Sequence, residues 1–174
     1  KLLSSIANAE WEAMMFGPYF QDQPKYYSCW IDFCLKYNPD MKFYLSDAWP
    51  QLSQLKERPK SEAFFTDEVL DQLAEERKKM HALIIDPLRK AYPGKVFILP
   101  TSDSMVLAAK HFIRGELPGI EGLHRVIGKK ERSLWRDQLG HLGPGFERLE
   151  GYVFYATLYG KSPELIESNI SFGG

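Results

Sequence analysis

The sequence has 174 residues, of which 44% are hydrophobic and 26% are charged, and its formal net charge is −1. These proportions are typical of a globular protein, and the length allows one domain with a sizeable hydrophobic core, so we predict a single domain over residues 1–174. The near-neutral charge offers no basic surface, and no apolar run approaches the roughly 20 residues of a membrane-spanning helix. Nucleic acid is therefore excluded as a partner, and no transmembrane segment is expected.

Three apolar runs predict buried strands at Trp11–Phe16, Met41–Leu45 and Lys95–Leu99. A strand that is covered on both faces reads as a continuous hydrophobic segment, because neither set of alternating side chains meets water. Each run ends in a turn signal or at a proline, which limits its length.

Helical spacing of apolar residues separates these runs. It predicts four helices: Tyr26–Tyr37, a long helix that Thr66 caps and Pro93-Gly94 ends, Ser104–Arg114, and Phe146–Tyr159.

Polar residues between the third strand and the third helix predict a side-chain cap from Thr101, Ser102 or Asp103. The following stretch, Gly115–Lys130, contains four glycines and mixed charges, which predicts a surface loop or lid with an exposed His124.

Alternating strands and helices indicate the α/β class, with right-handed crossovers and a parallel sheet. We therefore predict a three-layer α/β/α flavodoxin-like sandwich that is incomplete at the N-terminus. Binding and catalytic groups of such sheets lie beyond the carboxyl ends of the strands. This rule directs attention to residues 17–23, 46–54 and 100–104.

The sequence lacks the strong signatures of several enzyme classes. It contains no Walker A loop, no dinucleotide-binding glycine motif, no H-E-x-x-H and no G-x-S-x-G elbow. Its four histidines are scattered without metal-ligand neighbours, so we predict no metal and no cofactor.

His141 stands out because it lies in a turn-rich segment directly before the last helix. A histidine on such a loop can act as a general base when a carboxylate holds its other ring nitrogen, and Asp137 is the nearby candidate. The alternative is structural: Asp137 ends a preceding segment and His141 packs in a turn.

The chain resembles the SGNH (GDSL-like) hydrolases over most of residues 10–165. The resemblance is carried by Asn38-Pro39-Asp40 before the second strand, Asp47-Ala48-Trp49-Pro50 after it, the strand ending at Pro100, the Asp137–His141 segment, and residues 154–163. It implies a serine hydrolase of ester bonds in which His141 is the general base and Asp137 orients it.

Two departures from that family are visible. The family's acid precedes its histidine by three residues, whereas Asp137 precedes His141 by four and Gln138 occupies the three-back position. The block that carries the nucleophile is missing, so the resemblance implies a serine outside this chain. Ser102 is a conceivable internal nucleophile, with Ser104 beside it, but polar residues at a strand–helix junction are more often caps.

Trp49 and Asp47 follow the second strand and are the predicted substrate-binding residues. An aromatic ring there could stack on a sugar, which would suit an acylated carbohydrate, although Trp49-Pro50 could equally anchor the loop.

The sequence is therefore compatible with two functions. The first is an SGNH-type ester hydrolase whose serine lies in a companion N-terminal segment, so that this chain alone is inactive. The second is a non-catalytic α/β binding module or a degenerate relative. An unpaired strand edge would also favour a homo-oligomer, and the resemblance slightly favours a soluble secreted or periplasmic protein.

Overall fold

The computed structural model describes residues 1–18, 21–144 and 146–165, and the chain forms two compact units. The first unit comprises residues 1–48 and 78–99, and the second comprises residues 49–77 and 100–174. Each unit has its own hydrophobic core. The assignment of residues 1–174 to one domain stays a prediction.

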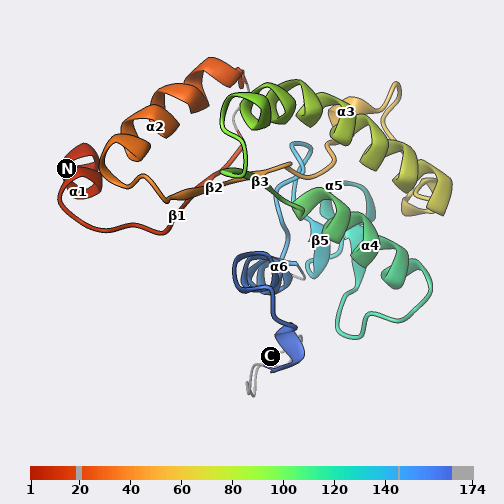
Figure 1. Ribbon diagram of the computed structural model, residues 1–174. Coiled ribbons are helices and arrows are strands. Elements are labelled where there is room, and N and C mark those ends of the chain that lie inside the picture. The colour runs from red at the N-terminus through yellow and green to blue at the C-terminus, as the bar shows by residue number, and fades with distance from the viewer. Residues whose placement is uncertain (19–20, 145, 166–174) are drawn as a thin grey trace. The chain divides into compact units, whose positions relative to one another are not determined.

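A parallel three-stranded sheet forms the centre of the first unit (Figure 1). Its strands β1 (Ala13–Phe16), β2 (Lys42–Ser46) and β3 (Val96–Leu99) are neighbours in chain order. All three strands were predicted from their apolar runs, with bounds that differ by one or two residues. The predicted α/β class with a parallel sheet is confirmed, and this strand order is consistent with part of a flavodoxin-like sandwich.

Helices precede and connect these strands. They are α1 (Leu2–Ala7), α2 (Pro24–Tyr37) and the second half of α3 (Asp67–Ala91). Thr66 was correctly predicted as the N-cap of α3, since its Oγ1 accepts a hydrogen bond of 3.4 Å from the backbone N–H of Val69. In the described part of the chain, no helix is both long and apolar enough to cross a membrane.

One face of the sheet contributes Phe43, Leu45 and Val96 to the core of the first unit. Strand side chains that share this face pack against buried residues of α2 and α3, among them Phe43 with Ile31 and Leu88. On the opposite face, the rings of Tyr44 and Phe97 stack with centroids 5.3 Å apart. Cys34 is buried in the same core, whereas Cys29 is exposed, and both are free thiols.

The second unit contains two very short parallel strands, β4 (Gly122–His124) and β5 (Ser133–Trp135). The one-turn helix α5 (Arg125–Gly128) follows β4 directly. The prediction of a surface loop over Gly115–Lys130 holds for residues 115–121, which contain no helix or strand, but was wrong for β4 and α5. The expected exposure of His124 was also wrong, since its exposed fraction is 2%. Strands of three residues are too short to display the alternation by which a sequence reveals a strand.

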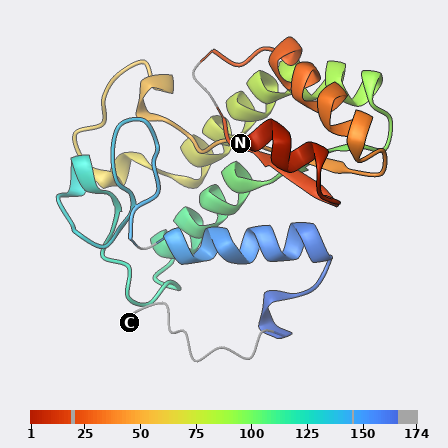
Figure 2. The ribbon, with the colours of Figure 1, turned by 90° about the vertical axis from the view of Figure 1, so that its left-hand side faces the viewer.

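Two longer helices complete this unit: α4 (Thr101–Ile113) and α6 (Glu147–Tyr159), which lie side by side (Figure 2). The predicted cap of α4 is wrong, because the helix already begins at Thr101 and its N-cap residue is Pro100, which makes no side-chain cap hydrogen bond. The hydroxyl of Ser104 instead donates to the carbonyl of Pro100 at 2.7 Å. Gly160 ends α6 in the left-handed conformation, as its position after the apolar stripe predicted.

Glu62 joins the segment before α3 to the β4–α5 turn. Its carboxylate accepts a 2.6 Å hydrogen bond from the backbone N–H of His124, and a Cβ atom on Gly128 would overlap that carboxylate. We expect Gly128→Ala to displace Glu62 and to lower the free energy of unfolding by about 1–2 kcal/mol, because a buried donor loses its acceptor.

Denaturant titration measures this loss, with Gly151→Ala as the matched control. Gly151 lies within α6 and has no atoms within 4 Å of an added Cβ, so alanine there should stabilise by about 0.5–1 kcal/mol. Equal effects of the two substitutions would contradict the role given to Glu62.

Candidate functional site

A tight hairpin follows β5 and presents the predicted catalytic pair. An antiparallel bridge joins Trp135 to Leu142, and the backbone N–H of Arg136 donates to the carbonyl of His141 at 2.8 Å. The hairpin therefore begins at the carboxyl end of a parallel strand, where α/β proteins commonly carry functional groups.

Asp137 and His141 are hydrogen-bonded to each other across this loop. Asp137 Oδ2 lies 2.6 Å from His141 Nδ1, while Oδ1 accepts the backbone N–H groups of Leu139 at 3.0 Å and of His141 at 3.3 Å. Both side chains are partly exposed, at 38% for Asp137 and 48% for His141. With Nδ1 engaged by the carboxylate, Nε2 is the nitrogen that remains for proton transfer.

The four-residue spacing between acid and histidine is accommodated by a glycine turn. Gly140 has φ +82°, a left-handed conformation that costs residues with a Cβ atom about 1–2 kcal/mol. The carbonyl of Gln138 accepts the backbone N–H of Leu52 at 3.2 Å. Thus Asp137, and not Gln138, is the residue that holds the imidazole.

Two opposing effects set the pKa of the Asp137 carboxyl. Partial burial raises the pKa of this carboxyl, but the bonds from the His141 side chain and from the two backbone N–H groups lower it by more, and the net pKa lies below its ordinary value. The carboxylate is therefore ionised at neutral pH, which is the state that can orient and stabilise a protonated imidazole.

Trp49, one predicted substrate-binding residue, contacts the same loop. An added Cβ on Gly140 would lie 3.0 Å from Trp49 Cδ1 and 2.5 Å from the carbonyl oxygen of Pro50. Trp49 is partly buried against the second core, so part of its ring anchors the segment.

Asp47, the other predicted substrate-binding residue, belongs to the first unit. It is 4% exposed directly after β2, and its backbone N–H donates to the carbonyl of Leu99 at 3.3 Å. Little of its side chain is available to a ligand in this conformation.

The two internal serines do not resemble activated nucleophiles. Ser102 is 1% exposed within α4, and the hydroxyl of Ser104 is engaged by the carbonyl of Pro100. A nucleophile needs an accessible oxygen within reach of its base. Ser102 is too buried to offer one, and the hydroxyl proton of Ser104 is already donated to a backbone carbonyl.

His124 is a polar residue of the second unit that the sequence did not single out. Its ring lies nearly parallel to those of Phe65 and Trp135, and the three centroids are 6.3–6.4 Å apart. Burial lowers the pKa of His124 to about 4; the nearby positive charge of Arg58 also lowers it, and Asp137 opposes both. The imidazole is therefore neutral in the folded protein at physiological pH. The sequence around His124 did not predict its burial, because Gly122-Leu123 and the residues after it were interpreted as a surface loop.

This burial predicts a pH-dependent stability. Between its ordinary pKa of 6.5 and the folded value of about 4, His124 binds more protons in the unfolded state, so stability falls as the pH is lowered through this window. The loss should reach about 3 kcal/mol. Denaturant titrations at several pH values measure it, and His124→Phe, which keeps an aromatic ring, should flatten the dependence. An unchanged slope in that variant, or an equal change in the exposed His111→Gln control, would contradict the assignment.

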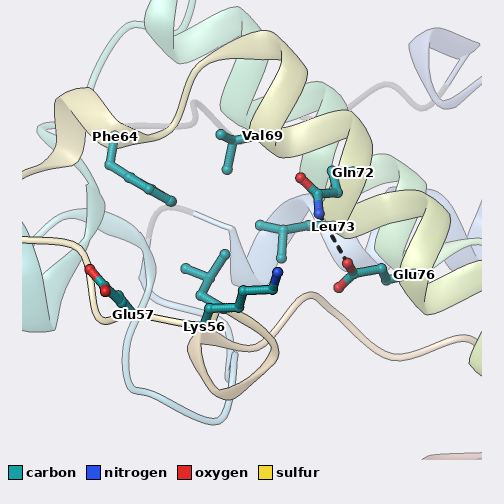
Figure 3. A pocket seen from close by; sticks show the side chains of 8 residues that line it. Lys56, Glu57, Phe64, Val69, Gln72, Leu73 and Glu76 are labelled. Atoms are coloured by element: carbon teal, nitrogen blue, oxygen red, sulfur yellow. Dashed lines mark hydrogen bonds between the residues drawn. The ribbon is translucent and has the colours of Figure 1, made fainter.

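A separate cavity of about 450 Å³ opens in the second unit beside the start of α3 (Figure 3). Leu55, Phe64, Val69 and Leu73 form its apolar wall, and Lys56, Glu57, Gln72 and Glu76 are its polar residues. Gln72 donates to Glu76 at 3.2 Å. Its volume is within the range of small-molecule sites, and none of its lining residues belongs to the Asp137–His141 loop.

Among the described residues, no cluster of three or more histidine, cysteine or carboxylate side chains could hold a metal ion. The 2.6 Å contact between Asp137 and His141 is the arrangement that proton transfer at His141 requires. Comparisons of the chain with protein-family models, curated proteins and solved structures found no match.

Proposed function

We propose that this chain is the back portion of an SGNH-type serine hydrolase that acts on ester bonds. The observation that carries the proposal is the 2.6 Å hydrogen bond between Asp137 and His141, on a loop that follows a parallel strand and leaves Nε2 of the histidine for proton transfer.

In the proposed reaction, His141 Nε2 takes the proton of a serine hydroxyl while that oxygen attacks the ester carbonyl. The same proton then passes to the leaving alcohol, and water repeats the cycle to release the acid. Asp137 fixes the tautomer with the proton on Nδ1 and stabilises the imidazolium that forms. The nucleophile is proposed to lie outside residues 1–174, in a preceding segment or a companion chain.

Trp49 is the residue best placed to contact the substrate, because it lies against Gly140 of the same loop. A partly exposed indole offers a flat apolar surface, which suits the acyl group or a sugar ring of a carbohydrate ester. Asp47, at 4% exposure, is the weaker of the two proposed contacts.

A fluorophosphonate tests the proposal, since it reacts covalently with activated serines. The protein is labelled as its source produces it, and the intact mass and the labelled peptide are read by mass spectrometry. Labelling on a serine that precedes Lys1, or on a companion chain, supports the proposal. Labelling at Ser102 or Ser104 instead places the nucleophile within the chain and contradicts that part of it.

The second candidate is a non-catalytic binding module, favoured by the cavity beside α3 and by the missing nucleophile block. In that case Asp137 and His141 only stabilise a turn, and exposed ion pairs of this kind contribute about 0–1 kcal/mol. No fluorophosphonate adduct, with an intact mass equal to residues 1–174, is the result that this candidate requires.

A further inference from the structure

His124 and Trp135 end the two parallel strands of the second unit and face each other in register. Asp137 follows Trp135 by two residues, so the position of this strand end determines the position of Asp137, the acid of the proposed catalytic pair. Both side chains are almost fully buried, at 2% and 3% exposure.

The hydrogen bonds of His124 define where its proton lies. Its Nδ1 accepts the backbone N–H of Val126 at 3.3 Å, so this nitrogen presents a lone pair. A neutral imidazole with an accepting Nδ1 carries its proton on Nε2. The ring is therefore a single tautomer with one outward N–H donor.

That donor is buried and has no hydrogen-bond partner within 3.5 Å among the described residues. A buried N–H group without an acceptor costs about 1–3 kcal/mol, so native structures rarely leave one unsatisfied. Two backbone carbonyls act on His124, that of Asp137 and its own, together with the charges of Asp137 and Arg58 and the Glu62 carboxylate on its backbone N–H. Its own carbonyl lies beside the Cα atom and cannot reach Nε2 at the far edge of the ring. Of these, the Asp137 carbonyl is the acceptor suited to Nε2–H.

From this arrangement we infer that His124 is a positioning residue for the Asp137–His141 pair, with its Nε2–H directed to the Asp137 backbone carbonyl and its ring fixed by Phe65 and Trp135. The Asp137 carbonyl already accepts Gly140 N–H at 3.1 Å, and a carbonyl oxygen has two lone pairs for two donors. The Asp137 carbonyl thus accepts from His124 at the start of the loop and from Gly140 across the turn. The consequence for catalysis rests on the proposed function, whereas the inferred hydrogen bond from His124 to the Asp137 carbonyl does not.

The test follows the Nδ1–H proton of His141 by NMR on isotope-labelled protein. A proton held in the 2.6 Å bond to Asp137 resonates far downfield and exchanges slowly with water. His124→Phe keeps an aromatic ring but removes Nε2–H, and we expect it to speed this exchange about tenfold, as the loss of one supporting hydrogen bond would. Phe65→Leu is the matched control, because it loosens the same three rings and retains both nitrogens of His124.

Unchanged exchange in His124→Phe would overturn the inference. So would equal acceleration in Phe65→Leu at the same loss of stability, because that pattern describes a purely structural ring. Should His124→Phe fail to fold, His124→Gln replaces it: its amide keeps a donor, so slow exchange despite lower stability supports the inference, and fast exchange contradicts it.

The hydrolase activity of the source protein separates this inference from the proposed function. If His124→Phe speeds exchange of the His141 Nδ1–H proton and also lowers kcat with little change in KM, the positioning role and the hydrolase proposal are both supported. If it speeds the exchange in a protein that no fluorophosphonate labels, the positioning role stands and the hydrolase proposal fails.

Discussion

Asp137→Asn is expected to lower kcat for ester hydrolysis about 10⁴-fold in the source protein while KM changes little. The ionised carboxylate accepts the Nδ1–H of His141 at 2.6 Å. An asparagine amide can turn its NH₂ group toward the ring, which places the imidazole proton on Nε2, where it blocks proton uptake from the serine. It also removes the negative charge that stabilises the imidazolium.

The matched control is a second exposed histidine–carboxylate pair of similar geometry. His111 Nδ1 lies 2.7 Å from Glu116 Oε2, with side-chain exposures of 44% and 50%, close to those of the pair in the loop. Glu116→Gln should leave kcat unchanged. His141→Ala should be at least as damaging as Asp137→Asn, because it removes the base itself. A kcat for Asp137→Asn within a few-fold of the unsubstituted protein would remove Asp137 from the mechanism.

Gly140→Ala is expected to lower the free energy of unfolding by about 3–5 kcal/mol, the largest stability effect proposed for this protein. Two costs add. A Cβ atom at φ +82° is strained by about 1–2 kcal/mol, and the same atom would lie 2.5 Å from the carbonyl oxygen of Pro50, an overlap that forces backbone to move at a further cost of about 1–3 kcal/mol.

Gly115→Ala separates these two costs. Gly115 lies in the same unit at φ +72°, but an added Cβ there meets no atom within 4 Å, so only the conformational cost of about 1–2 kcal/mol applies. Denaturant titration of both variants gives the difference. Equal losses would show that the close approach of Trp49-Pro50 to Gly140 contributes nothing, and the loop would then not depend on that segment.

Packing against a distant segment supports the proposed site in addition to the hydrogen bonds within the loop. The segment that starts at Trp49 meets Gly140, and Leu52 donates to the carbonyl of Gln138. Together with the inferred contact from His124, these interactions hold a pair of partly exposed side chains in one geometry. A positioned base gains most of its effect from such preorganisation, because small displacements of reacting groups are costly.

The sequence by itself determined the strands β1, β2 and β3, the helices α2, α3, α4 and α6, and hence the α/β class. These elements are long or strongly apolar, and their ends carry local signals such as Thr66 before α3 and Gly160 after α6. It also singled out Asp137 and His141, because a carboxylate and a histidine in a turn-rich segment are a recognisable chemical combination.

Only the tertiary structure decided the partner of His141 and the burial of His124. Spacing left Asp137 and Gln138 as alternatives, and the choice depended on the left-handed turn at Gly140, which forms against Pro50, about 90 positions earlier in the chain. His124 was predicted to be exposed because β4 and β5 are only three residues long. These strands pair with each other, and Phe65 stacks on His124. Contacts between distant segments produce no periodic pattern in the sequence. The burial of a residue that depends on such contacts therefore cannot be predicted from its sequence neighbours.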